Sequence, residues 1–376
     1  MCLAALVLPV SACTQAKGPE QAVTVTQVQS LPSGNHDSDL LHLLPTAGGS
    51  IDVVTDCDEE TEVCSSAVVS RDAVDDSLQW VVELTPAVHL SSSCPPPTGL
   101  YGEYHLGMDF YLSEAFGPAV VSPDGRHIAM VTCPALELDD DGWYVTDQRS
   151  GIVVLDAASG RMVRTIEVSG YVLGQVLTND ALVVQTAQDV NPALEGTLTI
   201  APLTDTSAAP TTLPADQWLV GSADGSVLLS PRRAANDCRL DPCGPMAVTR
   251  MSTEGTVLET IPGVERVYPG GWVKRFTDPS AAVDLAVEDS TKDREERDRN
   301  ARAALGREVL DLDSGATVDV TGMDVEPTAL PTGPGLLVSQ PADDEGDPAA
   351  TSTPVLWLSA ADDGRPHTEG LEAFSR

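Results

Sequence analysis

The sequence predicts an all-β fold made of one small sheet repeated several times, and three observations support this prediction. The 376 residues include 30 Gly and 28 Pro but only 4% aromatic residues, a composition typical of many short strands and turns. Apolar residues alternate over short segments separated by Gly or Asp turns. A unit of two hairpins recurs at intervals of about 45 to 60 residues. Four strands per unit at this spacing predict the blades of a β-propeller.

The chain begins with an apolar segment, residues 2–12, that is too short to span a bilayer and predicts the core of an export signal. It ends in VSAC at Cys13, which resembles the lipobox of bacterial lipoproteins. The resemblance implies a signal peptide over residues 1–12, lipid on Cys13 and a lipid-anchored tether over residues 13–21. Because the first basic residue is Lys17, we expect either that the true start codon lies upstream or that the chain has been trimmed. An ordinary secretory signal is the alternative.

The repeat is clearest over residues 117–170, which read AVVSPDGRHIAMVT and, after a loop, GIVVLDAASGRMVRTIEV. Similar second hairpins begin at Ala67, Leu198, Ala247, Glu308 and Val355. The first hairpins turn at Gly48-Gly49, Asn179-Asp180, Asp224-Gly225, Gly270-Gly271 and Gly333-Pro334-Gly335. We therefore expect one domain of six blades over residues 22–376, with seven blades as the alternative. Residues 23–28 are expected to add a strand that helps close the ring.

Two segments of this repeat resemble known propeller families. The SPDG turn at residues 122–125 resembles that of WD40-like and TolB-type bacterial propellers. The segment GIVVLDAASGRMVRTIEV resembles the repeats of YVTN-type and quinoprotein-like propellers. Both resemblances imply an architecture and neither implies a particular activity, because this fold carries many functions.

The long segments are expected on one face of the disc, because they fall between the second and third strands of the blades or before one first strand. The cysteines lie beside the same strand ends. Six of them remain after Cys2 and Cys13, an even number typical of an exported protein, and six cysteines allow fifteen pairings. Their positions favour the disulfides Cys57–Cys64, Cys94–Cys133 and Cys238–Cys243. Zinc is the competing interpretation, but the sequence has no Cys-x-x-Cys pair.

The charge excludes one class of partner. With 57 acidic and 21 basic residues the formal charge is −36, so nucleic acid would be repelled. Several acidic residues fall in the long segments, including Asp139, Asp140 and Asp141 beside Trp143. Glu137, Asp139 and Asp141 partly match the spacing of a Ca²⁺ loop, although Gln148 stands where a bidentate Glu belongs. No other cofactor is predicted, and solvated acidic loops are the simpler interpretation.

One long segment is expected to contain a short helix. Residues 290–305 begin with a capping Ser and carry opposite charges at helical spacing, before Gly306. With no apolar stripe before Ala301, this helix is expected to be a solvated spacer.

No enzyme motif is found: the sequence has no G-x-S-x-G, no H-E-x-x-H and no phosphate-binding Gly-rich loop. Polar residues near the starts of first strands are candidates for a site at the channel mouth, beside Tyr268 and Trp218: Asp216, Glu265, Arg266, Asp324 and Glu326. We expect an extracytoplasmic propeller on the outer face of the bacterial membrane that binds an envelope protein, a peptide or a small cationic ligand. A propeller enzyme, either a quinoprotein-like oxidoreductase or a hydrolase, is the alternative.

Overall fold

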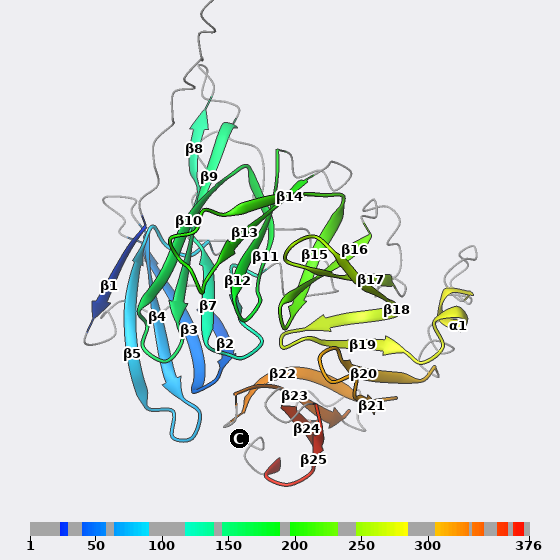
Figure 1. Ribbon diagram of the computed structural model, residues 1–376. Helices are drawn as coiled ribbons and strands as arrows, with labels where there is room; N and C mark the ends of the chain where they lie inside the picture. The colour runs from blue at the N-terminus through cyan, green and yellow to red at the C-terminus, as the bar shows by residue number, and fades with distance from the viewer. Residues whose placement is uncertain are drawn as a thin grey trace, which may run out of the picture.

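The described part of the chain folds almost entirely into antiparallel strands (Figure 1). The computed structural model describes residues 23–28, 40–57, 64–89, 117–138, 145–188, 196–231, 246–284, 305–330, 333–341, 352–359 and 364–371. Within these ranges 25 strands form five sheets, and one helix, α1 (Pro279–Asp284), follows β19. This helix is not long enough or apolar enough to cross a membrane. The all-β class is therefore confirmed, while the helix predicted over 290–305 lies outside the described residues.

The first sheet has five strands in the order β1-β5-β4-β3-β2. They are β1 (Thr24–Val28), β2 (Leu40–Thr46), β3 (Gly49–Cys57), β4 (Cys64–Asp72) and β5 (Leu78–Thr85). The sequence predicts a strand over residues 23–28 that helps close the ring. The strand is present, but it pairs with β5, with Thr24 opposite Thr85 and Val28 opposite Val81. It is therefore a fifth strand on the outer edge of this sheet.

The second sheet contains a hairpin that the sequence presents as a loop. Its strands are β6 (Ala119–Val121), β7 (His127–Val131), β8 (Ala135–Leu138), β9 (Val145–Asp156) and β10 (Met162–Ser169). The main order is β10-β9-β7-β6, and β8 pairs with the first part of β9, with Ala135 opposite Arg149. Figure 1 shows β8 and β9 projecting beyond the other strands. The long segment between the second and third strands of this unit, residues 134–150, is thus partly an extension of the sheet.

The third and fourth sheets follow in chain order. The third is β11 (Tyr171–Leu177), β12 (Ala181–Ala187), β13 (Gly196–Pro202) and β14 (Thr211–Ala215). The fourth is β15 (Gln217–Ala223), β16 (Ser226–Pro231), β17 (Met246–Ser252), β18 (Val257–Tyr268), β19 (Trp272–Phe276), β20 (Arg307–Asp311) and β21 (Thr317–Asp319). Its seven strands are two four-stranded units that share β18, because Val264 pairs with both Met246 and Arg275. Gly263, at φ 73°, lies at the change of partner.

The last sheet is β22 (Asp324–Leu330), β23 (Gly333–Gln340), β24 (Thr353–Ser359) and β25 (Pro366–His367). The turn predicted at residues 333–335 comes earlier, because Gly333 is already paired with Leu330. On the outer strands, the Trp357 ring stacks on His367 with centroids 4.1 Å apart. The indole N–H of Trp357 donates to the Glu369 carbonyl at 2.8 Å, which ties the C-terminal segment to β24.

The sheets follow one another around a common centre, from β1–β5 to β22–β25 (Figure 1). The first strands of neighbouring sheets are adjacent, since β2 contacts β6, β6 contacts β11, and β11 contacts β15. β2 also contacts β22, so the first and last sheets meet. Between β18 and β22, the Tyr268 hydroxyl donates to the Val325 carbonyl at 3.1 Å. This is the arrangement of a β-propeller.

Apolar side chains between the sheets form the core. One cluster joins Val53, Val68 and Leu84 of the first sheet to Ile128 and Val153 of the second. Further clusters join the second sheet to the third, the third to the fourth, the two halves of the fourth, and the fourth to the last. Because both faces of a sheet are covered, every residue of β12 is buried. Each fully buried Val, Leu or Ile contributes about 1.5 to 3 kcal/mol.

Replacing Gly160 with Ala is expected to lower the free energy of unfolding by about 2 kcal/mol, of which about 1 is the cost of a positive φ. Gly160 has φ 66°, and an added Cβ would lie 2.6 Å from the Trp80 ring. Trp80 cannot move freely, because its indole N–H donates to the Ala157 carbonyl at 2.9 Å. The measurement is urea unfolding followed by circular dichroism.

The matched control for that substitution is Gly315→Ala. Gly315 has φ 73° and nothing within 4 Å of an added Cβ, so it incurs the backbone cost alone. Equal losses for the two variants would contradict the contact between Gly160 and Trp80.

Candidate functional site

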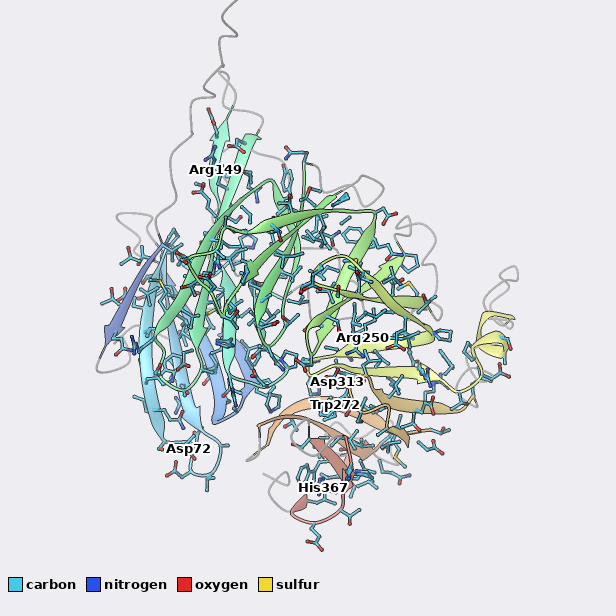
Figure 2. All side chains as sticks on the ribbon, in the orientation of Figure 1. Asp72, Arg149, Arg250, Trp272, Asp313 and His367 are labelled. Carbon is cyan, nitrogen blue, oxygen red and sulfur yellow. The ribbon has the colours of Figure 1, made fainter. Side chains whose placement is uncertain are left out.

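The two ends of the strands differ, and we name them by their connections. The turn end carries the short connections of residues 47–48, 73–77, 178–180 and 224–225, and the loop end carries the long connections of residues 58–63, 86–118, 232–245 and 277–306. Figure 2 shows Asp72, beside a short turn, and Arg149, near the loop end of β9, at opposite ends of the first two sheets. The strand ends that carry the long connections therefore lie at one end, as their sequence positions predict.

Hydrogen bonds join the turns of successive sheets at the turn end. The Asn179 side-chain oxygen accepts from the backbone N–H of Asp124 at 3.0 Å. The Asn179 side-chain nitrogen donates to Asp224 at 2.9 Å. The backbone N–H of Asp224 then donates to Asp313 at 3.2 Å. These four residues belong to turns of the second sheet, the third sheet and both halves of the fourth.

At the turn end, Gly125 lies at a contact between the first, second and last sheets. Its carbonyl accepts from the Ala47 N–H at 3.0 Å, which joins the first sheet to the second. It has φ 68°, and an added Cβ would lie 2.4 Å from Ala47 N and 2.7 Å from Pro334 Cδ of the last sheet. A larger residue would push these turns apart. The turns of the first, second and last sheets therefore pack closely against one another at the turn end.

Arg250 and Asp313 form the charged part of the same network, and Figure 2 shows them close together. The Arg250 guanidinium donates to Asp313 at 2.6 Å and to the Ser226 hydroxyl at 2.8 Å, as well as to the Leu312 carbonyl. Burial raises the pKa of Asp313, against the opposing effects of the Asp224 N–H and of Arg250. Arg250 and Asp313 thus use their charged groups for contacts within the protein.

At the loop end, Glu265 is held by two cations of the neighbouring strands. Its carboxylate lies 3.7 Å from Lys274 Nζ and 3.4 Å from Arg307 Nε. A shift of register between Val264 and Arg266 places Glu265 at an irregularity of β18. Arg307 also lies over the Phe276 ring, 4.2 Å from its centroid. Glu265 is therefore the centre of an ion cluster within β18–β20. Because its carboxylate already pairs with two cations, its predicted role as a ligand group is secondary.

Three of the other predicted residues are exposed where β18 meets β22. The Arg266 guanidinium lies over the Tyr268 ring, 5.4 Å from its centroid. Tyr268 is 2% exposed and bonds to Val325, which is 5% exposed. Asp324 and Glu326 flank Val325 and are exposed, as alternation along a strand requires. Within the described part of the chain, no ion pair is found for Arg266, Asp324 or Glu326, so they can bind opposite charges of a ligand.

Asp216 is exposed at the turn between β14 and β15, on the other half of the fourth sheet. Trp218, expected beside the mouth, is 1% exposed and belongs to the core, so it cannot line a site. Its neighbours Leu219 and Gln217 are bonded across to β12. Three of the predicted site residues, Arg266, Asp324 and Glu326, thus lie where β18 meets β22. Asp216 lies apart from them.

Of the residues predicted for Ca²⁺, Glu137 is described and lies exposed near the end of β8. Asp139, Asp140, Asp141 and Trp143 lie outside the described residues. Among the residues that the structure does describe, no group of three or more His, Cys, Asp or Glu could hold a metal ion. The calcium prediction therefore stays a prediction.

The described cysteines lie at the loop end. Cys57 and Cys64 face each other in the last register position of β3 and β4. Cys133 follows β7, and its N–H donates to the Ala87 carbonyl at 2.8 Å. Cys64 and Cys133 are each disulfide-bonded. Cys13, Cys94, Cys238 and Cys243 lie outside the described residues, so the three predicted pairings stay predictions.

Sequence reasoning missed the cations that organise both ends. Lys274 and Arg307 hold Glu265, and Arg250 holds Asp313. The sequence did contain a signal for these three cations. With 21 basic and 57 acidic residues in the chain, a basic residue within a predicted strand is unusual. Their partners could not be read from the sequence, since Arg250 and Asp313 are 63 positions apart.

No protein family and no curated protein sequence matches this chain. Among solved structures, it resembles the β-propeller domain of the trilobed protease from Pyrococcus furiosus, with 10% identity and a TM-score of 0.39, over 82% of this chain and 84% of that one. It also resembles an acylaminoacyl peptidase from Pyrococcus horikoshii, with 11% identity and a TM-score of 0.39, over 79% of this chain and 43% of that one. The apocarotenoid oxygenase of Synechocystis gives 9% identity and a TM-score of 0.34, over 92% of each chain. Similarities this low say nothing about activity.

Proposed function

We propose that this protein is an exported, lipid-anchored β-propeller of six blades that binds an envelope protein, a peptide or a small cationic ligand without catalysing a reaction. The observation that carries the proposal is the contrast between the two ends. The turns of the turn end are hydrogen-bonded to one another from sheet to sheet. The loop end carries the long connections, and the first strands that start at this end carry the exposed charges of Arg266, Asp324 and Glu326. A rigid scaffold that presents loops at one end is suited to recognition.

The count of six blades is supported by the strand order. Four-stranded units begin at β2, β6, β11, β15, the second part of β18, and β22. Sharing of β18 merges two units into one seven-stranded sheet, so six units are compatible with the five sheets. β1 and β8 are additions to the edges of the first and second units.

The exposed groups define the chemistry that the loop end can recognise. Asp324 and Glu326 attract a positive group, and the formal charge of −36 increases the local concentration of cations. Arg266, whose guanidinium lies over the Tyr268 ring, can bind a carboxylate by donating hydrogen bonds to it. A peptide carries both groups and satisfies both partners. The disulfide-bonded state of Cys64 and Cys133 constrains the strand ends beside the long connections, and a constrained surface loses less entropy on binding.

Neutralising Asp324 and Glu326 together, as Asp324→Asn and Glu326→Gln, is expected to reduce cross-linking of the partner in living cells several-fold, because two attractive charges are lost. The measurement is in-cell cross-linking followed by mass spectrometry, with the protein recovered at equal amounts. The control is Asp75→Asn with Glu254→Gln, which removes the same charge from exposed positions in hairpin turns at the opposite end of the strands. Equal cross-linking by both double variants would overturn the proposed site.

A further inference from the structure

The N-terminal strand determines where the chain enters the propeller. β1 is antiparallel to β5, with Thr24 opposite Thr85 and Val28 opposite Val81. β5 runs from the short turn at residues 73–77 to the long connection that starts at residue 86. Thr24 therefore lies at the loop end, on the outer edge of the first sheet.

Side-chain contacts hold this entry point in place. Val25 packs against the cluster between the first and second sheets, and Val28 packs against Val69 and Val81. The Gln27 side-chain N–H donates to the Ser159 carbonyl of the second sheet at 3.1 Å. β1 is thus attached to two sheets, and the chain before Thr24 leaves the propeller from a defined position.

The chain between Cys13 and Thr24 is short compared with the height of the sheet. Thr24 follows Cys13 by eleven residues. Eleven residues reach at most about 40 Å when fully extended, and a random coil of that length has a root-mean-square span of about 18 Å. β5, with 8 residues, is about 26 Å long. A segment with the shorter, typical span does not reach from the loop end past the turn end.

We propose that the loop end of this protein faces the membrane and that the turn end points away from it. The inference rests on the proposed lipid at Cys13, which places the bilayer one short segment away from Thr24. Electrostatic attraction does not set this orientation, because a chain of charge −36 is repelled by anionic headgroups. The ligands that reach Arg266, Asp324 and Glu326 are then those displayed at the membrane surface.

The test uses the full-length lipidated protein in vesicles of phosphatidylethanolamine and phosphatidylglycerol that carry an acceptor dye on the headgroups. A donor dye is attached through azidophenylalanine at Gln188 or at Thr206. Both positions are exposed and belong to the third sheet, Gln188 at the loop end and Thr206 at the turn end. We expect energy transfer to be several-fold higher from Gln188. Equal transfer, or more transfer from Thr206, would overturn the orientation.

A long insertion provides the control. About forty Gly and Ser residues placed after Glu20 give the segment a span of about 40 Å, longer than the sheet, and the difference between the two dyes should disappear. If the difference persists, the tether does not set the orientation.

Mass spectrometry of the protein extracted from membranes separates failure of this inference from failure of the proposed function. If Cys13 carries no lipid, both are wrong. If Cys13 carries lipid and Cys13→Ser releases the protein, but the two dyes transfer equally, the anchored binding protein stands and the orientation alone is wrong.

Discussion

Replacing Gln185 with Leu is expected to lower the free energy of unfolding by about 3 kcal/mol, because two buried backbone groups lose their partners. Gln185 is in β12 and is 0% exposed. Its side-chain N–H donates to the Gln217 carbonyl at 2.7 Å, and its oxygen accepts from the Leu219 N–H at 2.8 Å. Both partners are in β15, so one side chain joins the third sheet to the fourth. Leu has a similar volume, so the loss comes from the hydrogen bonds and not from a cavity.

The measurement for Gln185→Leu is equilibrium urea unfolding, compared with Gln340→Leu. Gln340 is exposed at the end of β23, so the same chemical change there should alter the stability by less than about 0.5 kcal/mol. Gln185→Glu is a second variant: the carboxylate can still accept from Leu219, but it has no N–H for the Gln217 carbonyl. A stability of Gln185→Leu close to that of the wild type would show that the two sheets do not depend on this bridge.

Acidification from pH 7 to pH 4 is expected to cost the protein about 3 kcal/mol through His89 alone. Burial away from water lowers the pKa of His89 from 6.5 to about 4. Its Nδ1 atom is buried and has no hydrogen-bond partner within the described residues. Its backbone N–H donates to the Val131 carbonyl at 2.9 Å, which holds the residue against the second sheet.

The sign follows from proton binding in the two states. Below pH 6.5 the unfolded chain protonates His89 while the folded protein does not, so protons favour unfolding. The stabilisation is present above pH 6.5, falls as the pH decreases, and is exhausted near pH 4, where the folded protein also takes up the proton. The measurement is urea unfolding of the wild type and of His89→Gln from pH 7.5 to pH 4. The difference between the two proteins should shrink by about 3 kcal/mol over this range, and a constant difference would contradict the buried neutral histidine.

Much of the fold could be predicted because it is encoded locally. The hairpin of β9 and β10 was predicted from alternating apolar residues around the turn AASG, and both strands occur where the pattern places them. The turn needs Gly160 at φ 66°, which few other residues adopt. The same reasoning holds for the turns at Asp224-Gly225 and Gly270-Gly271, where both strands of each hairpin are present.

The shared strand β18 could not be predicted, because its local pattern is ambiguous. The residues before Gly263 continue the hairpin from β17, and those after it begin the hairpin with β19. A connection or a continuous strand fits this sequence equally well. In the structure the strand is continuous, and an added Cβ at Gly263 would lie 2.8 Å from Pro279, so the chain after β19 packs closely against the change of partner.

Only the location of the candidate site could be compared with the structure. Arg266, Asp324 and Glu326 were proposed together because first strands begin at the same end of every blade, and the bond between Tyr268 and Val325 joins the two strands that carry them. The role of Glu265 was not visible, since it depends on Lys274 and Arg307 from two other strands. Trp218 was misplaced, because an apolar ring beside polar residues fits a site and a core equally well, and here it is 1% exposed.

The sequence by itself determined the strands, the tight turns, the acidic charge and the clustering of long segments between particular strands. These properties depend on neighbouring residues, whose dihedral preferences and alternation act over a few positions. The tertiary structure alone decided that the turns from Ala47 to Asp313 are joined into one network, and that β1 enters at the loop end on the outer edge of the first sheet. Those contacts join residues far apart in the chain, so they exist only once the sheets have packed face to face.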